Sequence, residues 1–477
     1  MLFNSISFAI FLPIVFVLYW FVAKKNLKFQ NLLLLVASYY FYACWDYRFL
    51  FLLIFSTLLD YFTGIKMHEA KSEQMKKFWF WLSISVNLGF LGVFKYYNFF
   101  VQSAADALSA VGFESHFWTL SIILPVGISF YTFHGLSYVI DIYKDRIKPE
   151  KNFVDYSVFV SFFPLLVAGP IERATHLLPQ IQTKRVFNSA NAADGLRQIL
   201  WGLFKKLVIA DNCAEYANMA FTNSGDHSGS THIMGVVFFT FQIYGDFSGY
   251  SDIALGTARL FGIDLLRNFA FPFFSRDVSE YWRRWHISLS SWFKDYLYIP
   301  LGGSRGGTWM KIRNTFIIFL VSGFWHGAAW TYVFWGFLNA LFMLPSLLSK
   351  RKPDLEIVAK GRIFATPKEM GQILLTFSLT VFMFIFFRAA DMSHAFQYLG
   401  EIFSMSTFTK PFGIKNEVVW LVLIFIFIEW MGREDQYAIE KIGFNWPKPL
   451  RLAFYYVLLA VIFMYAGSSQ EFIYFQF

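Results

Sequence analysis

A histidine surrounded by small residues lies within a long apolar stretch of the sequence. The segment reads Ser322-Gly-Phe-Trp-His326-Gly-Ala-Ala-Trp330, so glycine and alanine leave space around the imidazole ring. A buried neutral imidazole can take up a proton near physiological pH, which makes His326 a candidate general base. The alternative is a core histidine whose ring is satisfied by neighbouring helices, and the segment alone leaves both interpretations open.

Another histidine, His286, lies in a segment rich in aromatic and basic residues. Six aromatic residues occur between positions 281 and 296, with Arg283, Arg284 and Lys294 among them. Composition alone favours an amphipathic helix in the cytoplasmic membrane interface, where His286 is one more aromatic at headgroup level. If this helix also forms the mouth of a cavity, Arg283, Arg284 and Lys294 are candidates to dock an anionic substrate or carrier.

A third polar segment lies deep in an apolar run. It reads Gln242-Ile-Tyr244-Gly-Asp246-Phe-Ser-Gly-Tyr250-Ser-Asp252, and the four-residue spacing places Gln242, Asp246 and Tyr250 on one helical face. Such residues form either a satisfied polar cluster between helices or the wall of a cavity. Both interpretations remain open. The candidates for lining such a cavity are Gln242, Tyr244, Asp246, Tyr250, Asp252 and Trp325.

The composition requires a lipid environment for the elements that carry these residues. Of the 477 residues, 56% are hydrophobic, 22% are aromatic and only 15% are charged, against about 25% charged in an ordinary soluble domain. This excludes a disordered chain and a soluble fold. The net charge of +9 comes from Lys and Arg in short gaps between apolar runs, which indicates topology signals rather than a nucleic-acid surface.

Apolar runs recur along the whole chain, and roughly 20 apolar residues suffice to cross a bilayer. They lie at 5–23, 31–44, 48–65, 78–98, 118–142, 153–168, 196–221, 232–265, 312–348, 371–388, 416–431 and 452–467. No basic region precedes the first run and Lys24 and Lys25 follow it, so it is a first span rather than a cleaved signal peptide. We expect an all-α integral membrane protein with about 11–12 transmembrane helices in one polytopic domain, 1–477.

The distribution of Lys and Arg assigns sides to the loops. The basic gaps 24–28, 66–77, 144–151, 172–187 and 349–370 are expected in the cytoplasm, and 99–117, 222–231 and both termini outside. Because 144–151 and 172–187 fall on the same side, the run 153–168 is expected to be re-entrant, which requires protein or a cavity around its backbone. A cavity is therefore expected.

The run 312–348 is too long for a single span. At 1.5 Å per residue it would extend about 55 Å as one helix. Two spans joined by a tight turn near Gly327 resolve this length and place His326 in the outer half of the membrane. We also expect Cys44 and Cys213 to be buried structural thiols, and His68, His116, His227, His232 and His394 to lie at the surface.

The motifs together resemble the membrane-bound O-acyltransferase family, in particular its bacterial branch of alginate O-acetylation and teichoic acid D-alanyl transfer proteins. The matching segments are Trp282–Ser290, Asp295–Gly303, Gly323–Trp330, Leu124–Phe133, Ala168–Glu172 and Asp246–Asp252. They span roughly residues 120–345, the expected catalytic core. The regions 1–117 and 371–477 are expected to supply flanking spans.

The resemblance implies acyl transfer, of an acetyl group above all, from a thioester to a hydroxyl group through a protein-enclosed tunnel. His326 is then the catalytic base and His286 the second characteristic polar residue. No covalent Ser or Cys intermediate is needed, and Tyr250, Gln242 and Trp325 are possible oxyanion donors. A transporter or flippase and a non-catalytic membrane scaffold are the rival hypotheses.

The resemblance also implies the partners and the location of the protein. The donor is acetyl-CoA or an acyl carrier protein on the cytoplasmic side, with no tightly bound cofactor and no metal. The acceptor is a hydroxylated cell-surface or exported polysaccharide, or an extracytoplasmic partner transferase. We therefore expect a multi-pass protein of the cell (inner) membrane, in contact with membrane lipid and not with nucleic acid.

Overall fold

The chain is described by a computed structural model that covers residues 1–477 except 114–117, 122, 223, 350–353, 469 and 476–477. All regular secondary structure in the described part is helical. The chain divides into two compact units, Met1–Ser189 with Ala258–Leu266, and Ala190–Thr257 with Arg267–Phe477. Each unit is described in turn.

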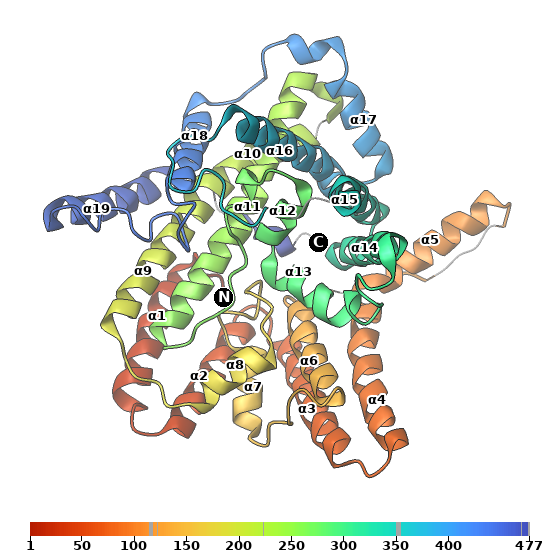
Figure 1. Cartoon of the computed structure of the whole chain (residues 1–477), viewed down its shortest axis with the longest axis vertical. Helices are drawn as coiled ribbons and strands as arrows, with labels where there is room; N and C mark the ends of the chain where they lie inside the picture. Colours follow the sequence, from red (N-terminus) through yellow and green to blue (C-terminus); the bar gives the residue numbers. More distant parts are fainter. Residues whose placement is uncertain (114–117, 122, 223, 350–353, 469, 476–477) are drawn as a thin grey trace. The chain divides into compact units, whose positions relative to one another are not determined.

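Among its described residues, the first unit contains eight α-helices and two π-helical segments. They are α1 (Ile6–Val17), η1 (Leu18–Val22), α2 (Leu27–Ala43), α3 (Tyr47–Glu69), α4 (Glu73–Leu91), η2 (Gly92–Tyr96), α5 (Tyr97–Ala110), α6 (Ile128–Tyr143), α7 (Phe153–Ser161) and α8 (Ala174–Gln182). Helix α3 packs against α4 and α6 (Figure 1). Between them the buried carboxylate of Asp60 accepts hydrogen bonds from Ser83 Oγ at 2.6 Å and Asn87 Nδ2 at 2.8 Å.

As predicted, the run 153–168 does not cross the membrane as one helix. Helix α7 has 9 residues, about 14 Å of helix against a hydrocarbon core of about 30 Å. The chain then turns through Pro164 to Gly169 with its side chains buried. Protein supplies partners for this broken backbone, since the Phe163 N–H donates to Ser38 Oγ at 3.1 Å and the Glu172 N–H donates to His134 Nε2 at 3.1 Å.

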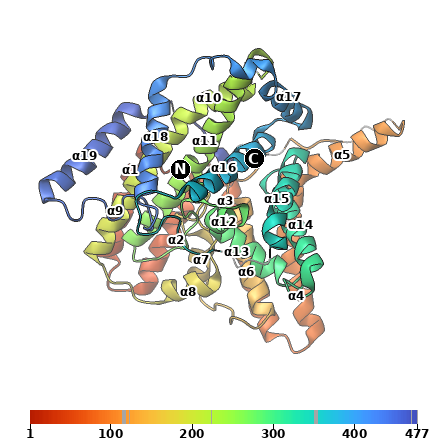
Figure 2. The same ribbon diagram turned by 45° about the horizontal axis from the view of Figure 1, so that its top comes forward.

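The second unit contains the three polar segments singled out by the sequence. Its α-helices are α9 (Ser189–Phe204), α10 (Asp211–Thr222), α11 (Gly229–Leu260), α12 (Val278–Arg284), α13 (Ile287–Phe293), α14 (Gly307–His326), α15 (Trp330–Leu348), α16 (Pro367–Arg388), α17 (Met392–Ile402), α18 (Asn416–Met431) and α19 (Lys448–Tyr465). The π-helical segments η3 (Lys205–Ala210) and η6 (Lys294–Tyr298) follow α9 and α13. Helices α10 and α11 lie side by side, as do α14 and α15 (Figure 2).

Five helices among the described residues are long and apolar enough to cross a membrane. They are Tyr47–Glu69, Glu73–Ala110 across its π-helical segment, Trp330–Leu348, Pro367–Arg388 and Lys448–Tyr465. A shorter apolar helix, Ile6–Val22, adds to them, and the predicted number of 11–12 spans stays a prediction. The integral membrane fold is thus confirmed.

Two predicted boundaries are wrong. The loop predicted at 99–117 is helical as far as Ala110, because α5 continues α4 through a π-helical segment. The predicted span 118–142 becomes helical only at Ile128, after Gly127 adopts a left-handed conformation with φ of 75°. A side chain at Gly127 would also meet the Leu166 carbonyl oxygen at 2.1 Å, so glycine allows the turn that starts α6.

Two predictions about burial are also wrong. Cys44 is exposed rather than buried, because it follows the last residue of α2, whereas Cys213 is buried as predicted. His232 is buried rather than at the surface, because α11 begins earlier than expected and carries it against the ring of Tyr398, 4.2 Å away. His116 lies outside the described residues.

Candidate active site at two buried histidines

His326 is the last residue of α14, at the turn of the predicted helical hairpin. Residues 327–329 connect α14 to α15, and the His326 side chain is buried with 6% exposure. The two helices can approach closely because Gly323 and Gly336 have no side chain. A Cβ at Gly323 would lie 2.2 Å from the Tyr332 carbonyl oxygen, and a Cβ at Gly336 would lie 2.2 Å from the Phe319 carbonyl oxygen. Small residues of this kind allow tight helix packing in membranes.

Aromatic rings enclose the His326 imidazole. Its ring centroid lies 4.9 Å from that of Trp325, 5.2 Å from that of Trp335 and 5.4 Å from that of Phe387. These side chains come from α14, α15 and α16. The rings give the imidazole a largely apolar environment, in which interactions between charges and dipoles are stronger than in water.

His286 lies at a break between two short helices, not within a continuous interfacial helix as predicted. Helix α12 ends at Arg284 and α13 begins at Ile287, while His286 adopts a left-handed conformation with φ of 44°. The interfacial prediction fails because Trp282, Trp285 and His286 face protein and are all buried. A left-handed conformation is uncommon for any residue with a side chain and marks backbone strain.

The His286 imidazole is inaccessible to solvent, with 0% exposure. Neither of its ring nitrogens has a hydrogen-bond partner among the described residues. Burial lowers the pKa of His286 to about 3, so the ring is neutral at physiological pH. Most buried polar atoms in proteins are hydrogen-bonded, so two unused nitrogens on one buried ring indicate a place for a ligand.

Asn268 holds the backbone on the C-terminal side of His286. The Asn268 carbonyl oxygen accepts from the Ile287 N–H at 2.9 Å, and its Oδ1 accepts from Ser288 Oγ at 2.6 Å. Its Nδ2 donates to Ser251 Oγ of α11 at 3.3 Å. Sequence reasoning did not single out Asn268, because a lone Asn in a loop carries no periodic signal.

Three aromatic rings link the two histidines, and together with the two imidazoles they form a closed circuit of five rings. The ring of Trp325 lies 6.2 Å from His286 and 4.9 Å from His326. On the other side, Phe247 lies 4.7 Å from His286 and 4.7 Å from Tyr474, whose ring is 6.3 Å from His326. The structure therefore brings together α11, the α12–α13 break, the end of α14 and the C-terminal segment. Tyr474 was missed by the sequence reasoning.

The predicted polar face of α11 takes part in a buried charge network. Asp246 pairs with Lys206 at 2.8 Å, and Asp252 pairs with Lys205 at 2.6 Å. The Tyr244 hydroxyl donates to Glu429 Oε2 at 2.5 Å. Two consecutive lysines inside the predicted apolar run 196–221 were a signal for this network, because a buried cation requires a partner.

The other two members of this face have different surroundings. Gln242 is buried, and its Oε1 has no hydrogen-bond partner within the described part of the chain. The ring of Tyr250 packs on Phe472 with 5.1 Å between centroids. Gln242 and Tyr250 thus belong to the same unit as the ring circuit, on the helix that contributes Phe247.

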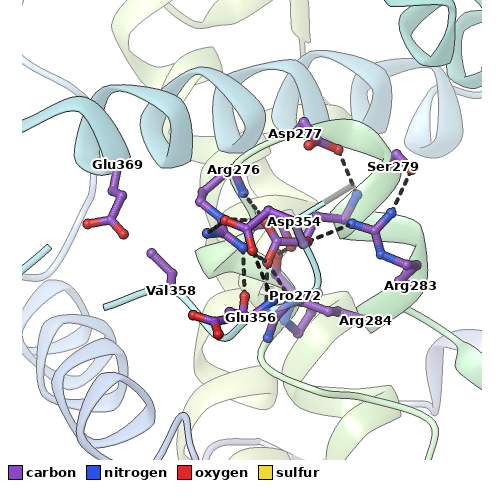
Figure 3. Close-up of polar contacts among 12 residues, drawn as sticks. Pro272, Arg276, Asp277, Ser279, Arg283, Arg284, Asp354, Glu356, Val358 and Glu369 are labelled. Atoms are coloured by element: carbon purple, nitrogen blue, oxygen red, sulfur yellow. Dashed lines mark hydrogen bonds and ion pairs between the residues drawn. The ribbon is translucent and has the colours of Figure 1, made fainter. Parts of the chain in front are cut away.

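Arg283 and Arg284, the arginines predicted to dock a donor, differ in whether a neighbouring carboxylate already neutralises their charge. Arg284 pairs with the buried Glu280 at 2.7 Å, and Arg276 pairs with the same carboxylate at 2.9 Å. Arg283 Nη1 donates to Ser279 Oγ at 2.8 Å, while Arg276 also binds the Asp354 carboxylate (Figure 3). Lys294 is exposed.

A cavity of about 270 Å³ lies beside these arginines. It is lined by Arg267, Ala270, Glu280, Arg283, Arg284, Asp354, Leu355, Ile357, Arg433, Glu434 and Asp435. Four arginines and four acidic residues line it, so charges of both signs meet there and the net charge of the lining is small.

Comparison with known proteins identifies relatives along the whole chain. Residues 146–387 match the model of the membrane-bound O-acyltransferase family. The chain is 34% identical to the probable alginate O-acetylase AlgI of Pseudomonas putida, over 100% of both chains. It is 33% identical to the peptidoglycan O-acetyltransferase of Helicobacter pylori, over 100% of this chain and 98% of that one. It is 29% identical to the teichoic acid D-alanyltransferase of Streptococcus thermophilus, over 56% of this chain and 69% of that one.

Proposed function

Because the chain belongs to the membrane-bound O-acyltransferase family, we propose that it moves an acetyl group from a cytoplasmic thioester to a hydroxyl group of an extracytoplasmic polysaccharide. Its enzyme class and its place in a membrane follow from the family and from the apolar helices.

The environment of His286 is the observation that supports a reaction at the two histidines. This residue combines a strained backbone, full burial and two ring nitrogens without a hydrogen-bond partner among the described residues. Strain and unused polar atoms at one position are typical of functional sites. The ring circuit through Trp325 connects this position to His326.

In the proposed reaction His326 acts as the general base. Its imidazole takes the proton of the acceptor hydroxyl while the oxygen attacks the thioester carbonyl carbon. The tetrahedral intermediate collapses as the C–S bond breaks, and the imidazolium returns the proton to the departing thiolate. The products are the O-acyl ester and the free thiol, and no covalent bond to the protein is required.

His286 is proposed to stabilise the developing oxyanion. A neutral imidazole has one N–H donor, and in a dry site such a donor stabilises a charge that appears only in the transition state. Gln242 and Trp325 supply further N–H groups in the same unit. Tyr250 is a further candidate donor. Removal of one oxyanion donor typically costs about 10²–10³ in kcat.

The donor is proposed to arrive at the arginine-lined cavity beside α12. Acetyl-CoA and acyl carrier proteins both carry an acyl thioester on a phosphorylated arm, which Arg283 and Lys294 can attract. Arg284 contributes less than its charge implies, because Glu280 already neutralises it. The acyl arm then reaches the histidines through a tunnel from the cytoplasmic side of the inner membrane.

The acceptor class is proposed from the relatives that match along their whole length. Those relatives are named for O-acetylation of alginate and of peptidoglycan, both of which are polysaccharides outside the cytoplasmic membrane. The more distant relative is named for transfer to teichoic acid. A second extracytoplasmic transferase that completes delivery to the polymer is part of the proposal.

The test uses purified protein, acetyl-CoA or an acetylated carrier protein with a labelled acetyl group, and alginate or peptidoglycan fragments. We expect label in an ester bond that mild base releases, and its loss in the His326→Gln variant. A transporter or flippase would move the label across proteoliposomes without forming an ester. A scaffold would do neither, and either result would overturn the proposal.

A further inference from the structure

A buried ion pair holds the C-terminal segment 470–475, here called the tail. Lys206 Nζ donates to the Gln470 carbonyl oxygen at 3.2 Å, and the Ile473 N–H donates to Asp246 Oδ2 at 2.7 Å. Lys206 and Asp246 are paired with each other at 2.8 Å. Each partner of one ion pair therefore binds the tail backbone at a separate point.

The tail carries aromatic side chains into the ring circuit. Phe472 and Ile473 are buried, and the ring of Phe472 packs on Tyr250. The ring of Tyr474 lies 4.7 Å from Phe247 and 6.3 Å from His326. The tail therefore contributes one wall of the histidine site.

We propose that the Lys206–Asp246 pair is a positioning device that fixes the tail across the site and keeps Tyr474 against His326. The π-helical segment η3 places Lys206 toward α11, and Asp246 lies one residue before Phe247 of the ring circuit. A buried charge pair is costly to maintain, and here both partners also bind main-chain atoms of the tail. The expected effect on kcat rests on the proposed function, whereas the attachment of the tail does not.

The neighbouring pair Lys205–Asp252 provides a matched control. It joins the same two helical segments, with 2.6 Å between Nζ and Oδ2, and Gln198 Nε2 donates to Asp252 Oδ1 at 2.8 Å. Within the described residues, the hydrogen bonds and ion pairs of Lys205 and Asp252 do not involve the tail. Either Asp246→Ala or Asp252→Ala would therefore weaken the charge network in general. Only Asp246→Ala would also release the tail.

The Asp246→Ala variant is expected to fold, because Lys206 keeps a second counter-ion. Its Nζ also pairs with Asp211 at 2.9 Å. The Asp252→Ala variant removes the one ion-pair partner that Lys205 has among the described residues and is the harsher change. Ile473→Pro is a second test variant, because proline removes the N–H that donates to Asp246 and leaves the ion pair intact.

The experiment measures exposure of the tail with a single cysteine at Phe472→Cys, after Cys44→Ser and Cys213→Ala. The purified full-length protein is treated with a maleimide. We expect labelling about tenfold faster in Asp246→Ala and in Ile473→Pro than in the parent, because a lost charge-assisted hydrogen bond favours local opening. The Asp252→Ala variant is expected to label at the parental rate. In a second measurement, Asp246→Ala and Ile473→Pro are made in the protein that retains Phe472, and kcat is expected to fall in both.

Three results would overturn the inference. They are equal labelling in Asp246→Ala, Ile473→Pro and the parent, equally fast labelling in Asp252→Ala, or a released tail with unchanged kcat. Failure of the proposed function is seen separately. A parent that transfers no acetyl group but protects its cysteine would refute acyl transfer and leave the attachment of the tail in place.

Discussion

The phenol ring of Tyr474 lies against the imidazole of His326, with 6.3 Å between the ring centroids. These residues belong to the C-terminal segment and to the end of α14. Their contact shows that the site is completed by a segment that follows all of the long helices. The same segment is held by Lys206 and Asp246, so the polar network on α11 and the histidine site form one structural unit.

Substitution of His326 by Gln should reduce acyl transfer by about 10²–10⁴-fold, the usual contribution of a general base. Glutamine retains hydrogen bonding but cannot take up a proton at neutral pH. The measurement is the initial rate of ester formation by the purified protein. His232→Gln is the control, because His232 is another buried histidine of the same unit that binds the Ser228 carbonyl oxygen and lies outside the ring circuit. Retention of more than a few per cent of the rate would remove His326 from the base role.

Substitution of Gly323 by Ala should destabilise the protein, although alanine normally favours a helix by about 1 kcal/mol. The added Cβ would lie 2.2 Å from the Tyr332 carbonyl oxygen, so α14 and α15 would have to separate. Gly371→Ala in α16 is the matched change, because a Cβ there meets nothing within 4 Å. We expect a lower thermal midpoint for the first variant and an equal or higher one for the second. Equal midpoints would show that the hairpin tolerates the extra atom.

Substitutions of Arg283 and of Lys294 by Glu should raise the apparent KM for the thioester donor and leave the dependence on acceptor nearly unchanged. The effect should weaken with salt, because exposed charges are screened within about 10 Å at 0.1 M. Arg284→Glu should instead lower the yield of folded protein, since it places a second carboxylate beside the buried Glu280. Unaltered donor kinetics in folded Arg283→Glu and Lys294→Glu variants would leave these cations as anchors for lipid headgroups.

The assignment of sides can be tested with an impermeant maleimide on intact cells. Of the positions in the predicted outer loops, Ser115 lies outside the described residues and Ser224 is buried, whereas Asp226 is exposed. We therefore expect a cysteine at Asp226 to react and one at Lys360, which is also exposed, to be protected. Cys44 must first be replaced because it is exposed. Labelling at position 360 and not at position 226 would show that the predicted sides of the membrane are reversed.

The sequence by itself determined the membrane fold, the family and the local placement of His326. An apolar run of twice the thickness of the bilayer can only fold back on itself, and glycine next to His326 marks where it does so. The re-entrant run 153–168 was predictable for a similar reason, because the charges on both sides of it exclude a single crossing. Such features depend on residues that are close together in the chain, so composition and spacing record them.

Only the tertiary structure decided which distant residues meet at the site. The helix break at His286 depends on Asn268, and the pairing of Asp246 with Lys206 depends on how η3 packs against α11. The tail reaches the site because Lys206 and Asp246 bind its backbone. Contacts between segments far apart in the chain leave no periodic pattern in either segment, since a buried lysine or a terminal tyrosine has the same local neighbours whatever it packs against.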